Sequence, residues 1–233
     1  LDAAIGPWLC SMYRQYPDLG KGTHYWSVSW LPESQREVLK GKNLNDDSAL
    51  LDFSKRILAK HTQAVPSDVA FAAGADDALF ATLCHLVAQD RLSMISVWSP
   101  TFALQLMDNL QAWGEEIVKA LDQGSWGARQ ASLAQIRAPR APHRSRLLSH
   151  VLRQPRFDPK RLWPHLALVS SWDTAGAVAW AEQLKNRLPH AGFEGKGMWA
   201  TEGVVTLPYN GCYPLAYQSH FYEFENLETG EIM

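Results

Sequence analysis

Apolar side chains recur every three or four residues through much of the first half of the chain. This spacing predicts helices, which cover residues 3–16, 46–61, 76–89 and 99–113. Between them, alternating or continuous apolar runs predict two strands, over residues 23–31 and 91–98. The first half therefore mixes helices with short buried strands.

The pattern becomes more regular after Leu166. Residues 166–172 read as a strand, residues 173–188 as a loop and a helix, and residues 192–200 as a second strand. Strand, helix and strand within about 30 residues form a βαβ unit, which favours parallel pairing. Two further strands are predicted over residues 203–208 and 219–226. The sequence thus predicts an α/β fold with a mostly parallel sheet flanked by helices.

Residues 125–161 differ in composition, with nine basic residues and four prolines. We interpret them as a basic helical excursion on the surface. Contact with phosphate is the alternative, but few aromatic residues are interleaved and the net charge of the chain is -2, which favours a solvated helix face. One partial domain, residues 1–233, is then expected to comprise three subregions: residues 1–124, this excursion, and the βαβ subregion (162–233).

Composition and missing motifs exclude several classes of protein. The slightly negative charge gives no reason to expect a nucleic-acid partner, and no apolar run reaches the roughly 18 residues of a membrane span. Three widely spaced cysteines without a CxxC pair indicate reduced thiols and a cytoplasmic protein. GxSxG, HExxH, Walker A and GxGxxG motifs are absent. The oligomeric state stays open.

The stretch "GKGMWATEGVVTLP", residues 195–208, does not fit a plain core strand. Gly195, Gly197 and Gly203 would weaken a strand, and such glycines often mark the close approach of another backbone or of a ligand. Glu202 is costly to bury unless it is paired or bound to a cation. We interpret the stretch as a strand, a tight polar loop and a second strand.

Two polar loops follow neighbouring strands of the predicted sheet. "SSWDTAG" spans residues 170–176 and "GMWATEG" spans residues 197–203. Ligands of open α/β sheets bind outside the carboxyl ends of the strands, so both loops would border one crevice. Trp199 could stack on a flat ring, Thr201 could hydrogen-bond a phosphate, and Glu202 could hold Mg²⁺. The alternative is a helix-capping Asp173, a core Trp199 and a surface Glu202, and residue chemistry alone favours neither.

"GMWATEG" resembles the aromatic–small–x–Thr/Ser–Glu motif of the adenylate-forming superfamily. Longer stretches are similar to a narrower group, the auxin-responsive GH-three (Gretchen Hagen) family of acyl-acid amido synthetases, in its bacterial branch. They are "RLWPHLALVSSW" (161–172), "GKGMWATEGVVTLP" (195–208) and "YPLAYQSHFYEFEN" (213–226). "WSVSW" and "LSMISVWSPTFALQLMDNL" fit the same family, so the resemblance spans most of the chain.

The resemblance implies part of the large N-terminal domain of an adenylate-forming enzyme. Residues 1–124 would form its acyl-side subregion and residues 162–233 its nucleotide-binding βαβ subregion. It also implies roles for individual positions. Thr201 and Glu202 would act in catalysis, with Glu202 as the Mg²⁺ ligand. The residues expected to bind ATP are Ser171, Thr174, Gly176, Trp199, Ala200 and Thr201. Those expected to border the acyl acid are Trp98, Phe102 and Trp172. Residues 221–224 match the strand before the ribose-binding motif of the family.

The implied activity is ATP- and Mg²⁺-dependent joining of a carboxylic acid to the amine of an amino acid, both small molecules. Two alternatives are a thioester-forming ligase that uses coenzyme A, and a non-catalytic module that retains the fold. The family's phosphate loop is expected before Leu1, and its ribose-binding motif and mobile C-terminal domain after Met233. The chain thus resembles the central portion of such an enzyme.

Overall fold

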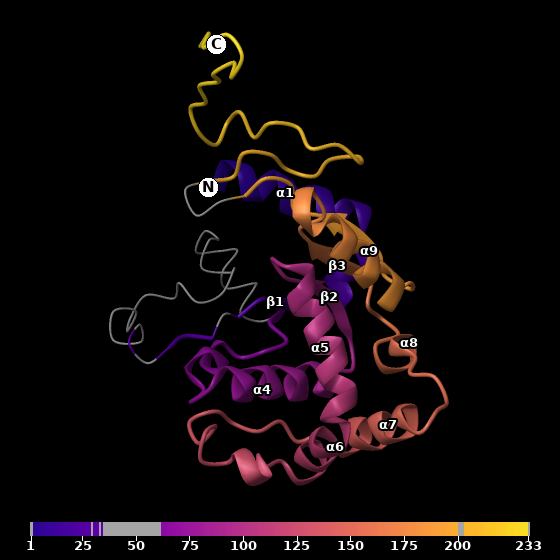
Figure 1. Ribbon diagram of the computed structural model, residues 1–233. Coiled ribbons are helices and arrows are strands. Elements are labelled where there is room, and N and C mark those ends of the chain that lie inside the picture. Colours follow the sequence, from indigo (N-terminus) through magenta and orange to yellow (C-terminus); the bar gives the residue numbers. More distant parts are fainter. Residues whose placement is uncertain (1, 29, 33, 35–61, 200–202, 233) are drawn as a thin grey trace.

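A four-stranded parallel sheet forms the centre of the protein. The computed structural model describes residues 2–28, 30–32, 34, 62–199 and 203–232 (Figure 1). The strands lie in the order β1 (Thr23–Trp26), β2 (Leu92–Ser96), β3 (Leu168–Ser171) and β4 (Gly192–Gly195). Ile95 of β2 pairs with Tyr25 on one side and with Val169 on the other, and the β1–β2 register shifts once, between Thr23 and His24. The predicted parallel α/β fold is confirmed.

Helices cover both faces of this sheet. Figure 1 shows α1 (Asp2–Gln15) on one side and α4 (Ala75–Ala88) and α6 (Gly114–Gln123) on the other. The remaining α-helices of the described chain are α5 (Pro100–Ala112), α7 (Pro142–Leu152), α8 (Pro159–Leu162) and α9 (Val178–Arg187). Among the described residues, 3₁₀ turns cover Pro17–Lys21, Ser67–Phe71, Gly127–Arg129 and Ala175–Ala177. None of the described helices is long and apolar enough to cross a membrane.

The two faces of the sheet bury separate hydrophobic clusters. Tyr25 belongs to the larger cluster, with α4 to α7 and α9, whereas its neighbour Trp26 belongs to the smaller one, beneath α1. Val169 and Leu168 divide in the same way. Successive strand residues point to opposite faces, so β1 and β3 contribute to both clusters. The near-continuous apolar runs read from the sequence reflect this two-sided burial.

Local sequence signals set several helix ends. Ser99 precedes α5 and its Oγ accepts a hydrogen bond from the Thr101 N–H at 3.3 Å, while Pro100 occupies the first turn. Asp158 caps α8 through the Lys160 N–H at 3.0 Å. α6 ends at Gly124, whose φ of 68° is the left-handed conformation common at helix C-termini.

Most predicted elements before residue 200 are present. The helices expected at 3–16, 76–89 and 99–113 are α1, α4 and α5, and the strands expected at 23–31 and 91–98 are the shorter β1 and β2. The helix expected at 46–61 lies outside the described residues.

The strands predicted over residues 203–208 and 219–226 are wrong. The described part of this region contains only isolated bridges, such as Thr206 with Leu215 and Glu225 with Ile232. Phe221 is 91% exposed, so the apolar alternation there faces no sheet or core. Alternation predicts a strand only where one face is buried, and this segment has no such face in the described structure.

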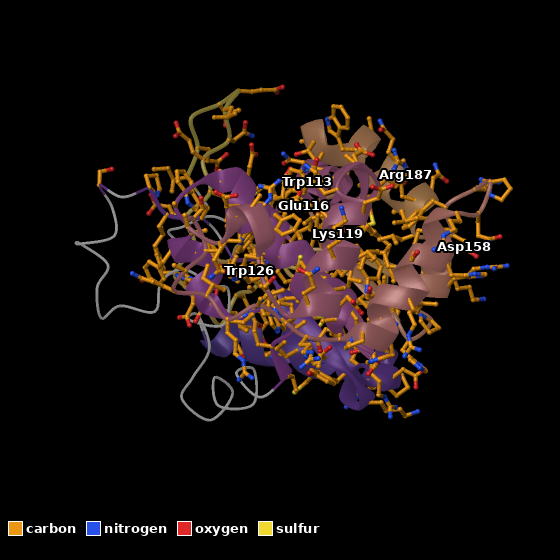
Figure 2. The ribbon with its side chains drawn as sticks, turned by 90° about the horizontal axis from the view of Figure 1, so that it is seen from below. Trp113, Glu116, Lys119, Trp126, Asp158 and Arg187 are labelled. Atoms are coloured by element: carbon orange, nitrogen blue, oxygen red, sulfur yellow. The ribbon has the colours of Figure 1, made fainter. Side chains whose placement is uncertain are left out.

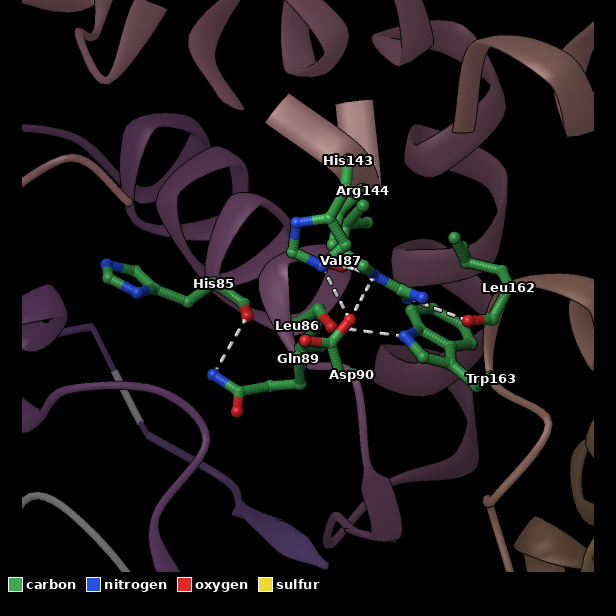
Figure 3. Close-up of polar contacts among 9 residues, drawn as sticks. All are labelled: His85, Leu86, Val87, Gln89, Asp90, His143, Arg144, Leu162 and Trp163. Atoms are coloured by element: carbon green, nitrogen blue, oxygen red, sulfur yellow. Dashed lines mark hydrogen bonds and ion pairs between the residues drawn. The ribbon is translucent and has the colours of Figure 1, made fainter. Parts of the chain in front are cut away.

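Seven of the nine basic residues in segment 125–161 are exposed, as expected of a solvated helix face, but two arginines are held within the protein. Arg144 of α7 is buried, and its Nε and Nη2 donate to the carbonyl oxygens of Val87 and Leu162, each at 2.7 Å (Figure 3). Burial lowers the pKa of Arg144, and the carboxylate of Asp90 opposes that shift. The Trp163 indole N–H donates to Leu86 O at 3.1 Å. The last turn of α4 is therefore held by two side chains, those of Arg144 and Trp163.

Arg129 is likewise engaged within the protein. Its guanidinium lies over the rings of Phe80 and Trp113 at 4.5 and 5.0 Å. It also pairs with Asp77 at 2.9 Å and with Glu116 at 2.8 Å; Trp113 and Glu116 lie close together in Figure 2. Two of the arginines read as solvated therefore act as internal anchors. The division of the chain into three subregions stays a prediction.

Candidate functional site at the carboxyl ends of the strands

Three tryptophans predicted to line the site converge where the strands end. Trp98 follows β2, Trp172 follows β3 and Trp199 follows β4. The ring centroid of Trp98 lies 5.5 Å from that of Trp172 and 5.6 Å from that of Trp199. Because the strands are parallel, these segments end at one edge of the sheet, as predicted from the two loops.

Hydrogen bonds to one carbonyl oxygen join the backbones of Trp98 and Trp172. The Trp172 N–H and the Ser171 Oγ both donate to the carbonyl oxygen of Trp98, each at 3.0 Å. Ser171 is fully buried, so its hydroxyl joins the ends of β2 and β3 beneath the edge. Trp98 and Trp172 remain half-buried and line the edge itself.

Trp199 is a core residue in this structure. It is 9% exposed, and its indole N–H donates to Thr206 O at 3.1 Å. Its ring meets Trp8 of α1 edge-to-face, with centroids 5.0 Å apart. Stacking of Trp199 on adenine stays a prediction.

Lys196 is a central residue that the sequence analysis did not single out. It directly follows β4, is 1% exposed, and its Nζ donates to Ser96 Oγ at 2.8 Å. The same Nζ lies 5.2 Å from the Trp8 ring and 4.9 Å from the Trp98 ring. The sequence did contain one indication that Lys196 lies beside Glu194. Side chains two residues apart in a strand point to the same face, and Lys196 lies two residues after Glu194.

Glu194 lies beside this lysine on the α1 side of the sheet. Its Oε1 accepts a hydrogen bond from the Trp8 indole N–H at 3.0 Å. Burial raises the pKa of Glu194, while the Trp8 hydrogen bond and the charge of Lys196 oppose the rise. Glu194 and Lys196 thus both contact tryptophan rings, Glu194 through the Trp8 N–H and Lys196 through the Trp8 and Trp98 rings.

Asp173 and Tyr213 form a second polar contact at this edge. The Tyr213 hydroxyl lies 2.7 and 2.8 Å from the two Asp173 carboxylate oxygens. Burial and the Asp173 carboxylate both raise the pKa of Tyr213. Asp173 is therefore engaged with Tyr213, and no side-chain cap is formed at Thr174 or Ala177, where the following 3₁₀ turn and α9 begin.

The glycines of residues 195–203 make room for protein atoms. A Cβ on Gly195 would collide with Tyr213 Oη and Asp173 Oδ1. A Cβ on Gly197, whose φ is 72°, would lie 2.8 Å from Thr206 O, and one on Gly203 would lie 2.8 Å from the His220 ring. Close approach was predicted correctly, but the approaching groups belong to the chain itself.

Three other predicted site residues make none of the ring contacts described above. Phe102 of α5 is half-buried and packs against the larger hydrophobic cluster, whereas Trp98 packs against the smaller one. Thr174 and Gly176 are exposed in the loop before α9, and the space around Gly176 is open. The loop between β3 and α9 is therefore open to solvent.

Ala200, Thr201 and Glu202 fall within the part of the chain that the structure leaves undescribed. Within the described residues, no three His, Cys, Asp or Glu side chains gather where a metal ion could bind. The Mg²⁺ role therefore depends on Glu202 and stays a prediction.

A cavity of about 870 Å³ lies elsewhere, between α5, α9 and residues 154–161. Asp158 and Arg187 on its rim appear on one side of Figure 2. The cavity extends to Pro189, shortly before β4, and none of the predicted site residues lines the cavity.

The fold and this edge define an α/β domain of the kind that binds ligands beyond its strand ends. Residues 3–192 match the family model described as the GH3 family N-terminal domain, and the chain belongs to the GH3 family. The 195–208 motif lies beyond the matched residues. The bacterial branch stays a prediction.

Two solved structures are similar in fold. The first, "GH3.15 acyl acid amido synthetase", has a TM-score of 0.65 and 14% identity, and the alignment covers 96% of this chain and 43% of that one. The second, "AtGH3.15 acyl acid amido synthetase in complex with 2,4-DB", has a TM-score of 0.66 and 14% identity, with 97% and 42% covered. This chain thus spans less than half of the length of either. No curated protein sequence matched the chain.

Proposed function

We propose that the protein containing this chain is an ATP-dependent acyl-acid amido synthetase. It would activate a carboxylic acid as an acyl-adenylate and transfer the acyl group to the amine of an amino acid. The observation that carries this proposal is membership of the GH3 family over residues 3–192. The likeness to solved acyl acid amido synthetases and the three tryptophans at the strand ends support it.

The tryptophans suit two flat or apolar groups bound side by side. Trp98 and Trp172, both half-buried, would border the acyl acid, and Trp199 would border adenine. Thr174 and Gly176 lie in the exposed loop beside them, where a ligand can approach. Thr201 would hydrogen-bond the phosphates and Glu202 would hold Mg²⁺, which neutralises phosphate charge when bound.

The proposed reaction has two steps. A carboxylate oxygen of the acid bonds to the α-phosphorus of ATP, and the bond to pyrophosphate breaks. The amine nitrogen then bonds to the acyl carbon, AMP leaves with the electron pair of the broken C–O bond, and the nitrogen loses a proton. Neither step needs a protein nucleophile. The protein contributes alignment and charge stabilisation, which are the functions suited to a preorganised crevice.

The test is acid-dependent pyrophosphate release by the full-length protein, supplied with ATP, Mg²⁺, and panels of carboxylic acids and amino acids. Release that requires an acid, with amide formed when an amino acid is present, is the expected result. Glu202→Gln is expected to lower it at least tenfold, on the order of losing one electrostatic contact in the transition state. Glu182→Gln, an exposed change on α9, is the matched control.

Two outcomes would contradict the proposal. Thioester formation that depends on coenzyme A, without amide formation, would support the thioester ligase instead. Adenylation by Glu202→Gln at the wild-type rate would remove the Mg²⁺ role from Glu202.

A further inference from the structure

The cavity between α5, α9 and residues 154–161 lies at the opposite end of the sheet from the candidate site. It is lined by residues 186–189, which end α9 and precede β4, whereas the candidate site follows the carboxyl ends of the strands. The ten residues of α9 span about 15 Å, with the loop of the candidate site before the first of them. The cavity is therefore a separate place on the molecule.

The floor of this cavity is apolar. Met107 of α5 is 2% exposed, and Phe157 is half-buried and packs against the larger hydrophobic cluster. Pro155, Pro159 and Pro189 add further apolar lining. The volume of about 870 Å³ falls within the range of roughly 300–1,000 Å³ that is usual for small-molecule sites. The cavity thus has room for a ligand with an apolar chain or ring.

Three arginines lie on the rim, and they carry more charge than the acidic residues beside them. Arg187 pairs with Asp108 at 3.0 Å, and Arg161 Nε lies 3.7 Å from Asp158 Oδ2. Arg156 is exposed and makes no ion pair within the part of the chain that the structure describes. Both existing pairs are about half exposed, and such pairs contribute little, so Arg161 and Arg187 can also turn toward a bound anion.

The surroundings of the cavity are also positive. Segment 125–161 holds nine basic residues and one acidic residue, Asp158, in a chain whose net charge is -2. A surface with one sign of charge attracts ligands of the opposite sign. A guanidinium group suits carboxylates and phosphates in particular, because its planar fork can donate two parallel hydrogen bonds. The side-chain amides of Gln111, Gln154 and Asn186 supply further donors at the cavity.

We propose that this cavity binds a small organic anion, in which a carboxylate or a phosphate is joined to an apolar chain or ring. Arg156 binds the anionic group at the rim, with Arg161 and Arg187 beside it. The apolar part of the ligand lies on Met107 and Phe157. The inference does not rest on the proposed function, since none of the residues of the candidate site lines the cavity.

The test is calorimetric titration of the full-length protein with octanoate, octyl phosphate, octanol and acetate. Octanol lacks the charge and acetate lacks the apolar chain. At least one of the two octyl anions is expected to bind about tenfold more tightly than either control ligand, on the order of a hydrogen bond to a charged group. The anion that binds more tightly identifies the head group.

Substitution of Arg156 tests its role. Arg156→Gln is expected to weaken binding of that anion by about fivefold or more, the size of losing one hydrogen bond while two arginines remain. Arg156→Lys, which keeps the charge, is expected to retain the preference for the anion over octanol. The matched control is Arg146→Gln, an exposed arginine on α7 that does not line the cavity.

The position of the bound anion is tested separately. A diazirine-bearing octanoate is photolysed with the full-length protein, and the labelled residues are identified by mass spectrometry. Label on α5, α9 or residues 154–161 supports the proposal, whereas label confined to the strand-end site around Trp98 and Trp172 overturns it. If the cavity is labelled while acid-dependent pyrophosphate release is absent, the proposed function fails and this inference stands.

Three results of the titration would overturn the proposal. One is the absence of binding of either octyl anion by wild type at about 1 mM, the upper end of ordinary KM values. Another is an equal affinity for octanol, which would mean that the arginines do not take part. The third is wild-type affinity in Arg156→Gln, which is expected to fold because Arg156 is exposed.

Discussion

Asp173 and Tyr213, 40 residues apart in the chain, share one hydroxyl proton directly over Gly195. The Tyr213 Oη lies 2.7 and 2.8 Å from the two carboxylate oxygens. This contact joins the loop after β3 to the segment after β4, across a position where no side chain fits. The loop carrying Thr174 and Gly176 is thereby fixed at the edge of the sheet.

Gly195→Ala is expected to destabilise the protein by about 1–3 kcal/mol, the usual cost of overpacking. A Cβ at this position would displace the Tyr213–Asp173 pair. Urea denaturation measures the effect. Gly20→Ala is the control, because the space at Gly20 is open and its φ is not in the left-handed region. Equal stability of the two variants would show that the pair moves aside without cost.

Arg144→Ala is expected to cost about 2–4 kcal/mol of stability, because it leaves the Val87 and Leu162 carbonyl oxygens buried without their donor. Arg146→Ala, an exposed change one position beyond Ser145 on α7, is expected to stay within about 0.5 kcal/mol of wild type. Thermal unfolding of the Arg144→Ala and Arg146→Ala variants measures both effects. A small loss for Arg144→Ala would argue that water replaces the guanidinium.

Acid is expected to destabilise the protein through His85. Burial lowers the pKa of His85 from its usual 6.5 to about 4, opposed by the hydrogen bond that the imidazole donates to the backbone carbonyl oxygen of Arg137. The unfolded chain therefore takes up a proton near pH 6.5 that the folded chain takes up only near pH 4. The free energy of unfolding falls as the pH falls through that window, by up to about 3 kcal/mol.

His85→Gln is expected to flatten this part of the stability profile, measured by urea denaturation between pH 4 and pH 7. Burial also lowers the pKa values of His24 and His190, so a smaller slope of the same sign remains. His143→Gln, at a largely exposed position, is the control. A profile for His85→Gln parallel to that of wild type would contradict the assignment.

Trp199→Ala is expected to lower stability by about 3–5 kcal/mol, as for other buried tryptophans. The ring packs against Trp8 and Trp98, and its N–H donates to Thr206 O. Trp180→Ala removes a ring that is 46% exposed on α9 and is expected to have a much smaller effect. Similar losses for both, in thermal unfolding, would mean that Trp199 is not part of the core.

Sequence periodicity predicted the sheet well because both of its faces are buried. β2 and β3 lie in short runs rich in apolar residues and interrupted only by serines, and α4 and α5 have the spacing of core helices. The same reasoning failed at residues 219–226, where alternation occurs without burial. It also misjudged Arg144, because the carbonyl oxygens that accept its hydrogen bonds come from elements 18 and 57 residues away.

Topology predicted part of this edge of the sheet. Parallel strands bring the loops after β3 and β4 to one edge, so Trp172 and Trp199 could be grouped from the sequence, whereas Trp98 was assigned through the family resemblance. Lys196 could not be grouped with them, since a single lysine in a strand gives no sign of the three rings around it. Nor could the partners of Gly195, because Tyr213 approaches from a segment without regular structure.

The most direct test of the proposed site is calorimetric titration of the full-length protein with Mg-ATP and with AMP. Trp199→Leu, which fills the core position without a flat ring, is compared with Trp180→Leu on the exposed face of α9. The account predicts that wild type and Trp180→Leu bind both nucleotides and that Trp199→Leu binds them at least tenfold more weakly, on the order of one lost stacking contact. Wild-type affinity in Trp199→Leu, or no binding by wild type, would contradict it.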